Sequence, residues 1–165
     1  MSLLKKIKPV HRSVFYIAAV VVLIIGISFF SNNPEAEEVG GSDMGTVVFE
    51  DQTLMEVEVA DSVQERTRGL SGHAPLGPEE GMLFLFDDKK IAGIWMKDML
   101  FSIDLIWLDG NMVVDLHSNL PLEDPVSTIY RPEVPVDRVL EIPAGFIEEH
   151  GVIVGDRLDI TLSES

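Results

Sequence analysis

The chain has 165 residues, no cysteine and a formal net charge of −16 at pH 7. This length supports one domain of ordinary size plus an extra segment, and the missing cysteines exclude disulfides, thiolate metal ligands and thiol nucleophiles. Four basic residues precede Ser13 and no acidic residue precedes Glu35, so the rest of the chain carries 8 basic and 28 acidic side chains, a net charge of −20. Such a charge opposes binding to nucleic acid phosphates and anionic lipid headgroups.

The first thirty residues predict a transmembrane anchor. The uncharged run VFYIAAVVVLIIGISFF starts at Val14 and ends at Phe30. As a helix it is roughly 25 Å long, close to the hydrocarbon core of a bilayer. The basic arm of residues 1–13 and the acidic residues after Pro34 predict a cytoplasmic N-terminus and a body outside the cell membrane. The segment FFSNNPEAEE matches a signal-peptide cleavage site poorly, so we expect the anchor to be retained.

Residues 31–45 are polar and Gly-rich and predict a flexible tether, and residues 46–165 predict the folded body. A hairpin is expected in FSIDLIWLDGNMVVDLH, with a type I′ turn at Asp109-Gly110. Alternation and β-branched content predict further strands at residues 46–49, 54–59, 82–86, 91–95, 139–142 and 157–162.

Two short helices interrupt these strands. In DSVQERTRGL, Asp61 or Ser62 is the expected N-cap, Glu65 completes a capping box with Ser62, and Gly69 ends the helix. The second helix is expected at residues 144–150. Together the elements predict a β-rich α+β domain whose antiparallel or mixed sheet curls into a small barrel to hide its edges. Residues 118–137 contain four prolines, which predict a long loop over this barrel.

The motifs VEVADSVQERTRGLSG, GMLFLF, IWMKDMLFSIDLIWLD, VLEIPAG and GVIVGDRL occur in an order that resembles the domain of unknown function 192 family. The resemblance covers roughly residues 54–160. It implies a compact β-barrel-like fold, often exported or membrane-attached, with no established activity. Family members commonly have Asn where this chain has Asp98, and many have cysteines in the loop that reads DPVSTIYRP here. Any chemistry that relatives perform with those groups would be different in this chain.

Two carboxylates stand alone in apolar strands, Asp104 in IDLIW and Glu141 in LEIPAG. An unpaired buried charge is unfavourable by several kcal/mol, so one hypothesis is a buried ion pair of Arg68 with Asp104 or with Glu141. Exposure of either carboxylate on a wet sheet face is the alternative. A third interpretation makes Asp104 and Glu141 the acid and base of a hydrolase, which requires both groups at one cleft.

Metal and cofactor sites are not predicted. His73, His117 and His150 lack zinc-ligand spacing, and the methionines are more typical of core packing than of a copper(I) site. Four aromatic residues and one methionine could line a shallow apolar pocket under the proline loop or simply fill the core; these are Trp95, Met96, Phe101, Trp107 and Tyr130.

The sequence favours binding over catalysis. We expect a membrane-anchored ligand-binding or interaction module of the cell envelope, with a small molecule, a glycan or an envelope protein as partner and no nucleic acid. The alternatives are the hydrolase and a structural component of an envelope complex. The candidate binding residues are Arg66, Arg68, Trp95, Lys97, Asp98, Asp104, Tyr130 and Glu141.

Overall fold

The computed structural model describes residues 43–122 and 128–163. The predicted basic arm, transmembrane segment and most of the tether lie outside these residues. Within the described part, no helix has the length and apolar character needed to cross a membrane.

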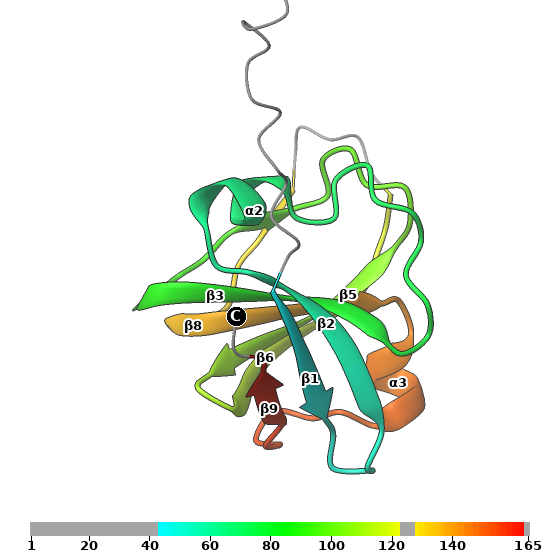
Figure 1. The fold of residues 1–165 in the computed structure, drawn as a ribbon, viewed down its shortest axis with the longest axis vertical. Helices are drawn as coiled ribbons and strands as arrows, with labels where there is room; N and C mark the ends of the chain where they lie inside the picture. The colour runs from blue at the N-terminus through cyan, green and yellow to red at the C-terminus, as the bar shows by residue number, and fades with distance from the viewer. Residues whose placement is uncertain (1–42, 123–127, 164–165) are drawn as a thin grey trace, which may run out of the picture. The chain divides into compact units, whose positions relative to one another are not determined.

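The described body is built mainly from strands, with two short helices (Figure 1). The helices are α2 (Val63–Arg68) and α3 (Phe146–His150). The strands are β1 (Met44–Val48), β2 (Leu54–Ala60), β3 (Glu80–Lys90), β4 (Ile94–Trp95), β5 (Ile103–Asp109), β6 (Met112–Leu120), β7 (Ile129–Tyr130), β8 (Val136–Pro143) and β9 (Asp159–Leu162). The predicted β-rich α+β class is therefore confirmed.

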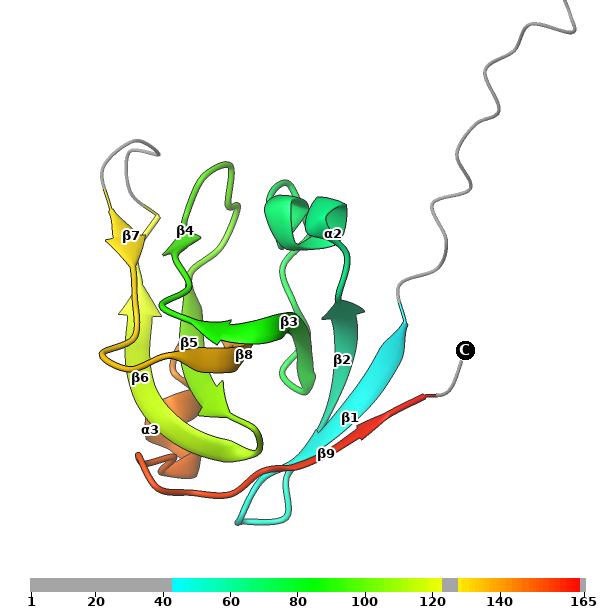
Figure 2. The ribbon, with the colours of Figure 1, turned by 90° about the vertical axis from the view of Figure 1, so that its left-hand side faces the viewer.

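Seven strands form a mixed sheet in the order β6-β5-β8-β3-β2-β1-β9, and β4 pairs with β7 in a second, two-stranded sheet. Strands β2 and β3 run parallel, and α2 lies in the connection between them. The main sheet is not the closed barrel expected from the sequence, because its order ends at β6 and β9 (Figure 2). An isolated bridge between Met112 and Arg157 links the start of β6 to the segment that leads into β9.

Local sequence signals account for α2 and the β5–β6 hairpin. The Ser62 hydroxyl accepts a hydrogen bond from the Glu65 amide, and the Glu65 carboxylate accepts one from the Ser62 amide, so the predicted capping box is present. The hairpin turn lies one residue later than predicted, at Gly110 and Asn111. Of these two, only Gly110 has a positive φ, 58°, which fits a type II′ turn rather than type I′.

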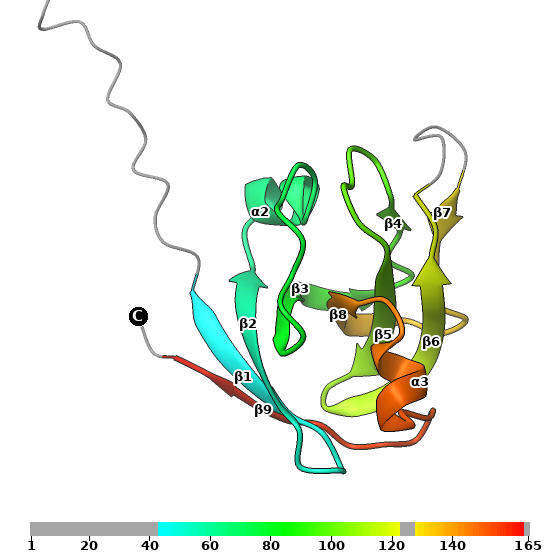
Figure 3. The same cartoon turned by 90° about the vertical axis from the view of Figure 1, so that its right-hand side faces the viewer.

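Apolar side chains pack on both faces of the main sheet. One cluster includes Leu140, Ile142 and Phe146 and lies under α3. The other includes Phe84, Leu105 and Trp107 and lies under the α2 end and the β4–β7 pair. Figure 3 shows α3 and α2 at opposite ends of the body. Because both faces are covered, the buried residues of β5 are apolar on both sides apart from Asp104.

The proline-rich segment is more structured than the long loop that we predicted. Strand β6 continues to Leu120 inside it, β8 begins at Val136, and the two-residue strand β7 lies between them. Strand β7 has only two residues, and it pairs with the equally short β4: Ile94 is opposite Tyr130 and Trp95 is opposite Ile129. Proline excludes longer pairing here but not a short edge strand.

Candidate functional site

A pocket of about 240 Å³ lies between the C-terminal end of α2 and strand β4, and we call it the α2–β4 pocket. It is smaller than the ~300–1,000 Å³ typical of pockets for drug-sized ligands. Figure 2 shows α2 and β4 at the same end of the body. The lining residues are Arg66, Thr67, Arg68, Gly69, Leu70, Ser71, Phe84, Gly93, Ile94, Trp95, Met99 and Glu141.

Glu141 provides the acidic group of this pocket. On β8 it pairs with Met82 of β3 on one side and with Leu105 of β5 on the other, so its neighbours across both strands are apolar. Directly paired residues share a sheet face, which puts Glu141 on the face of the Phe84 cluster. The residue is 4% exposed. No hydrogen bond or ion pair reaches its carboxyl group within residues 43–122 and 128–163.

The apolar environment determines the protonation state of Glu141. Burial among apolar side chains disfavours the charged form and raises the pKa of Glu141 to about 8. The carboxyl group is therefore mainly protonated at pH 7 and is a hydrogen-bond donor as well as an acceptor. Acidic groups with strongly displaced pKa values at the wall of a pocket are candidates for functional residues.

The two arginines of α2 have different roles. The half-buried Arg66 donates hydrogen bonds to the carbonyl oxygens of Asp61 and Leu85, the latter at 2.8 Å, and its guanidinium lies 5.7 Å from the Phe86 ring centroid. Arg66 therefore ties α2 to β3. Arg68 is exposed at the pocket, and none of the described residues forms an ion pair or hydrogen bond with its side chain.

Trp95 lines the α2–β4 pocket and is 49% exposed. The Lys97 ammonium lies 6.0 Å from the Trp95 ring centroid and 3.8 Å from the Asp98 carboxylate. Lys97 and Asp98 are thus close to the pocket without lining it. Their backbone is held by the segment after α2, because Ser71 Oγ donates to the Lys97 carbonyl and the Gly72 amide donates to the Asp98 carbonyl, both at 2.8 Å.

Asp98 occupies a left-handed backbone conformation with φ of 57°. Among residues with a side chain, Asn and Asp adopt this conformation most readily. The structure therefore gives a conformational reason for Asp98 at this position, and the Asn that the family resemblance implies here would satisfy the same requirement.

Asp104 lies on the opposite face of the sheet from Glu141. In the β5–β8 register it is opposite Ile142, one position away from the Leu105–Glu141 pair, and successive strand residues face opposite sides. Its buried carboxylate accepts hydrogen bonds from the amides of Asn119 at 2.7 Å, Gly145 at 3.1 Å and Ile147 at 2.9 Å.

This geometry corrects two hypotheses. The proposed Arg68–Asp104 and Arg68–Glu141 ion pairs are both absent among the described residues, because backbone amides satisfy Asp104 and no cation lies within 4.0 Å of Glu141. Asp104 and Glu141 do not face one cleft, as an acid–base pair of a hydrolase requires.

The remaining aromatic candidates belong to the core. Trp107 is fully buried and donates from Nε1 to His117 Nδ1 at 2.9 Å. The His117 ring in turn meets the Tyr130 ring edge-on, with centroids 5.6 Å apart. Tyr130 is half-buried and packs against the cluster that contains Trp107, so it supports β4 from behind rather than lining the pocket.

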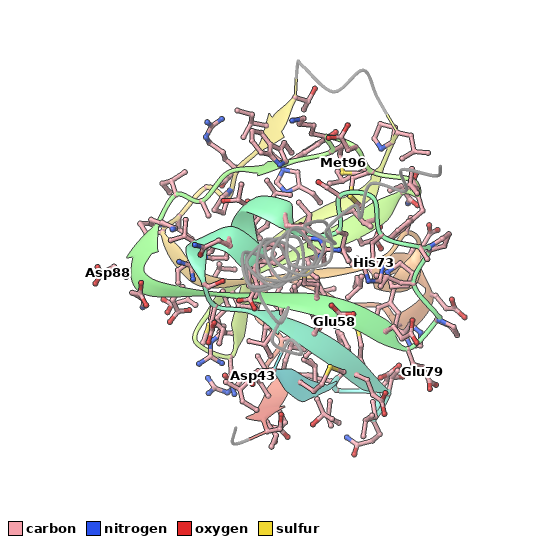
Figure 4. The ribbon with its side chains drawn as sticks, turned by 45° about the horizontal axis from the view of Figure 1, so that its top comes forward. Asp43, Glu58, His73, Glu79, Asp88 and Met96 are labelled. Atoms are coloured by element: carbon pink, nitrogen blue, oxygen red, sulfur yellow. The ribbon has the colours of Figure 1, made fainter. Side chains whose placement is uncertain are left out.

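The three candidate histidines have separate partners. His73 Nε2 lies 3.5 Å from Glu58 Oε1, on the face that Figure 4 presents. His150 Nδ1 lies 2.8 Å from Asp51 Oδ2, and its ring stacks on Phe146. In the described part of the chain, no group of three or more His, Cys, Asp or Glu residues is arranged to hold a metal ion.

Sequence reasoning missed the backbone and apolar part of the pocket. Gly69 has φ of 49°, and a Cβ there would lie 3.2 Å from the Phe84 ring. At Gly93 a Cβ would lie 2.8 Å from Ile129 Cγ2, so glycine allows β4 to pack against β7. The Arg-Gly-Leu and Ala-Gly-Ile-Trp motifs contain these glycines and were the available signal.

The fold and the pocket together define a small β-rich α+β domain with one buried acidic group facing an open pocket. The family model for DUF192, described as uncharacterized ACR, matches residues 46–160, and the chain belongs to this family. The resemblance inferred from the motifs is thus confirmed.

Two crystal structures have a similar fold. One is described as a "putative transcription regulator" from Sinorhizobium meliloti 1021; it is 26% identical, with a TM-score of 0.63, and the match covers 72% of this chain and 92% of that chain. The other is a protein of unknown function from Novosphingobium aromaticivorans DSM 12444; it is 28% identical, with a TM-score of 0.66 and coverage of 74% and 89%. No curated protein matches the chain.

Proposed function

We propose that the body is a ligand-binding module of the cell envelope that takes up a small molecule in the α2–β4 pocket. The observation that supports this proposal is Glu141: the residue is 4% exposed, it borders the pocket, and its carboxyl group has no partner among the described residues. The carboxyl oxygens reach the open pocket, because no side-chain oxygen of the described residues is both sealed from solvent and without a hydrogen bond. A ligand in the pocket can therefore form hydrogen bonds directly with this group.

The proposal includes attachment to the cell membrane through residues 14–30, with the body on the outer side. The support is the uncharged run between a basic arm and an acidic body. Because the chain has no cysteine, single cysteines are clean probes of topology. In intact cells, a membrane-impermeant maleimide is expected to label Gln64→Cys in the body and to leave Ser2→Cys unlabelled. Labelling of Ser2→Cys alone would contradict this orientation.

A thermal-shift screen of the full-length chain in detergent tests ligand binding. Compounds that bind the pocket are expected to raise the melting temperature of the wild type and of Glu148→Gln, an exposed control on α3 under the other face. The same compounds are expected to act weakly on Glu141→Gln and Trp95→Ala. Hits that stabilise all four proteins equally would place binding elsewhere and contradict the proposal.

Two other functions receive less support. The hydrolase hypothesis needs Asp104 and Glu141 at one cleft, and their positions on opposite sheet faces remove that basis. A nucleic-acid role, suggested only by the words used for one relative, is opposed by the 28 acidic and 8 basic side chains after the N-terminal arm.

A further inference from the structure

We infer that the ligand is a small zwitterion of the amino-acid type, whose ammonium group pairs with Glu141 and whose anionic group binds Arg68. This inference rests on the proposed function, because it names the chemical class that the α2–β4 pocket takes. It follows from four features: the wall around Glu141, the exposed guanidinium of Arg68, the size of the pocket and the charge of the body.

Glu141 lacks the donors that a buried carboxylate normally has. Its cross-strand neighbours, Met82 and Leu105, are apolar. Asp104 shows what a satisfied carboxylate looks like in this protein, with three backbone amides around it. A ligand in the pocket can supply donors to Glu141, and an ammonium group supplies up to three of them together with a compensating charge.

Arg68 offers the complementary group. Arg66 donates hydrogen bonds to the carbonyl oxygens of Asp61 and Leu85 and therefore has a structural role. The Arg68 guanidinium is exposed at the same pocket, and no partner of its side chain occurs in residues 43–122 and 128–163. A guanidinium binds a carboxylate through two parallel hydrogen bonds, so an anionic group of the ligand fits at this position.

The walls and the size limit what lies between the two charged groups. Leu70, Phe84, Ile94 and Met99 contribute apolar surface, and the volume is about 240 Å³. A compact molecule with a short apolar portion fits these walls, whereas a long oligosaccharide does not. The net negative charge of the body attracts the ammonium group and disfavours ligands that are purely anionic.

Protonation of Glu141 gives this inference a specific signature. In the empty pocket, burial raises the pKa of Glu141 to about 8, so the carboxyl group holds a proton at pH 7. When an ammonium group enters, the carboxylate becomes the favoured form and the proton passes to the solvent. About one proton is then released for each ligand bound at pH 7. A neutral or purely anionic ligand leaves the proton on Glu141.

Calorimetry on the full-length chain in detergent tests the inference. The probes are the free L-amino acids, their N-acetyl derivatives, which lack the ammonium group, and their amides, which lack the carboxylate. Titrations in phosphate and in Tris at pH 7 give the number of protons released. For the free amino acid that binds best, we expect release of about one proton and at least a roughly tenfold loss of affinity on N-acetylation.

Matched variants assign each end of the ligand. Glu141→Gln is expected to bind the free amino acid at least roughly tenfold more weakly than the wild type does, and its binding is expected to release no proton. Arg68→Gln is expected to bind the free amino acid about fivefold or more weakly than the wild type does, and to bind the amide with the same affinity as the wild type. Arg68 is exposed, so this variant keeps the fold. Glu148→Gln is expected to bind both probes normally.

The outcomes separate this inference from the proposed function. If no free amino acid binds, or if N-acetyl derivatives bind equally well without proton release, the zwitterion inference is wrong. If neutral sugars or simple carboxylates then bind the wild type but not Trp95→Ala, the pocket is still a binding site, but for a ligand class other than zwitterions. If neither these compounds nor the amino acids bind, both statements fail.

Discussion

Glu141→Gln exchanges the buried carboxyl group for a neutral amide of nearly the same size, and its effect on stability is expected to depend on pH. Burial raises the pKa of Glu141 from 4.5 to about 8 in the folded protein. Between these values the folded chain keeps a proton that the unfolded chain has released, so this residue makes the free energy of unfolding fall as the pH rises. The variant has no group that titrates at this position and is expected to lack this decline.

The size of the effect follows from the displacement of the pKa. A change from 4.5 to about 8 corresponds to roughly 5 kcal/mol, since each pH unit is worth about 1.4 kcal/mol. Relaxation of the pocket and entry of water reduce such a penalty, so we expect about 2–5 kcal/mol. The buried amide has a desolvation penalty of its own, but that penalty is the same at every pH. The slope of the difference between the two proteins is therefore the quantity to compare.

Urea unfolding between about pH 5 and about pH 9 measures this slope. Both tryptophans of the chain, Trp95 and Trp107, lie in the body, so their fluorescence follows its unfolding. Glu148→Gln is the matched control, because the same exchange at an exposed position is expected to leave the wild-type profile unchanged. A constant difference between Glu141→Gln and the wild type across the whole range would refute the assignment of a neutral, buried carboxyl group.

Three further predictions concern other carboxylates. Asp104→Ala removes the acceptor of three amides and is expected to lower the free energy of unfolding by about 3 kcal/mol or more; an unchanged urea midpoint would contradict this. Asp98→Asn is expected to keep the melting temperature, and Asp98→Val to lower stability by about 1–2 kcal/mol, because φ is 57° there; equal effects would disprove the conformational explanation. Hydrogen bonds from Thr53 and His150 lower the pKa of Asp51 to about 2, so Asp51→Asn is expected to be less stable than the wild type at neutral pH. That gap should close as the pH falls from about 4 to about 2, and a gap that persists at low pH would count against these hydrogen bonds.

Features coded by neighbouring residues were predictable from the sequence. The capping box of Ser62 and Glu65 is present as expected, because it depends on residues three positions apart. The β5–β6 hairpin was also expected, but its turn begins at Gly110 instead of Asp109. Type I′ and type II′ turns both accept Gly, and the pairing of β5 with β6 decides between the two positions.

Features that depend on strand register were not predictable. Asp104 and Glu141 look equivalent in the sequence, since each is one carboxylate in an apolar strand. The β5–β8 register puts them on opposite faces, and only then does one meet backbone amides and the other a pocket. Matching charges by type favoured Arg68 as the partner of Asp104, but backbone donors carry no sequence signal and satisfied the group instead.

The candidate site was recovered in part. Four of the residues singled out from the sequence, Arg66, Arg68, Trp95 and Glu141, line one pocket. Lys97 and Asp98 lie near Trp95, as expected for residues two and three positions after it in the chain. The apolar walls were not identifiable from the sequence, because Leu70, Phe84 and Ile94 are of the same residue types as the rest of the core. They differ from other core residues only in bordering the pocket.

The Asp104 carboxylate joins the end of β6 to the start of α3 through the amides of Asn119, Gly145 and Ile147. Asn119 is distant in the chain from Gly145 and Ile147, but all three amides bond to the same carboxylate, so release of one is expected to weaken the others. Their hydrogen–deuterium exchange should therefore proceed at similar rates, as expected of a single cooperative opening. The α3 turn and the far end of β6 would then unfold together, independently of local motions at the α2–β4 pocket on the other face of the sheet.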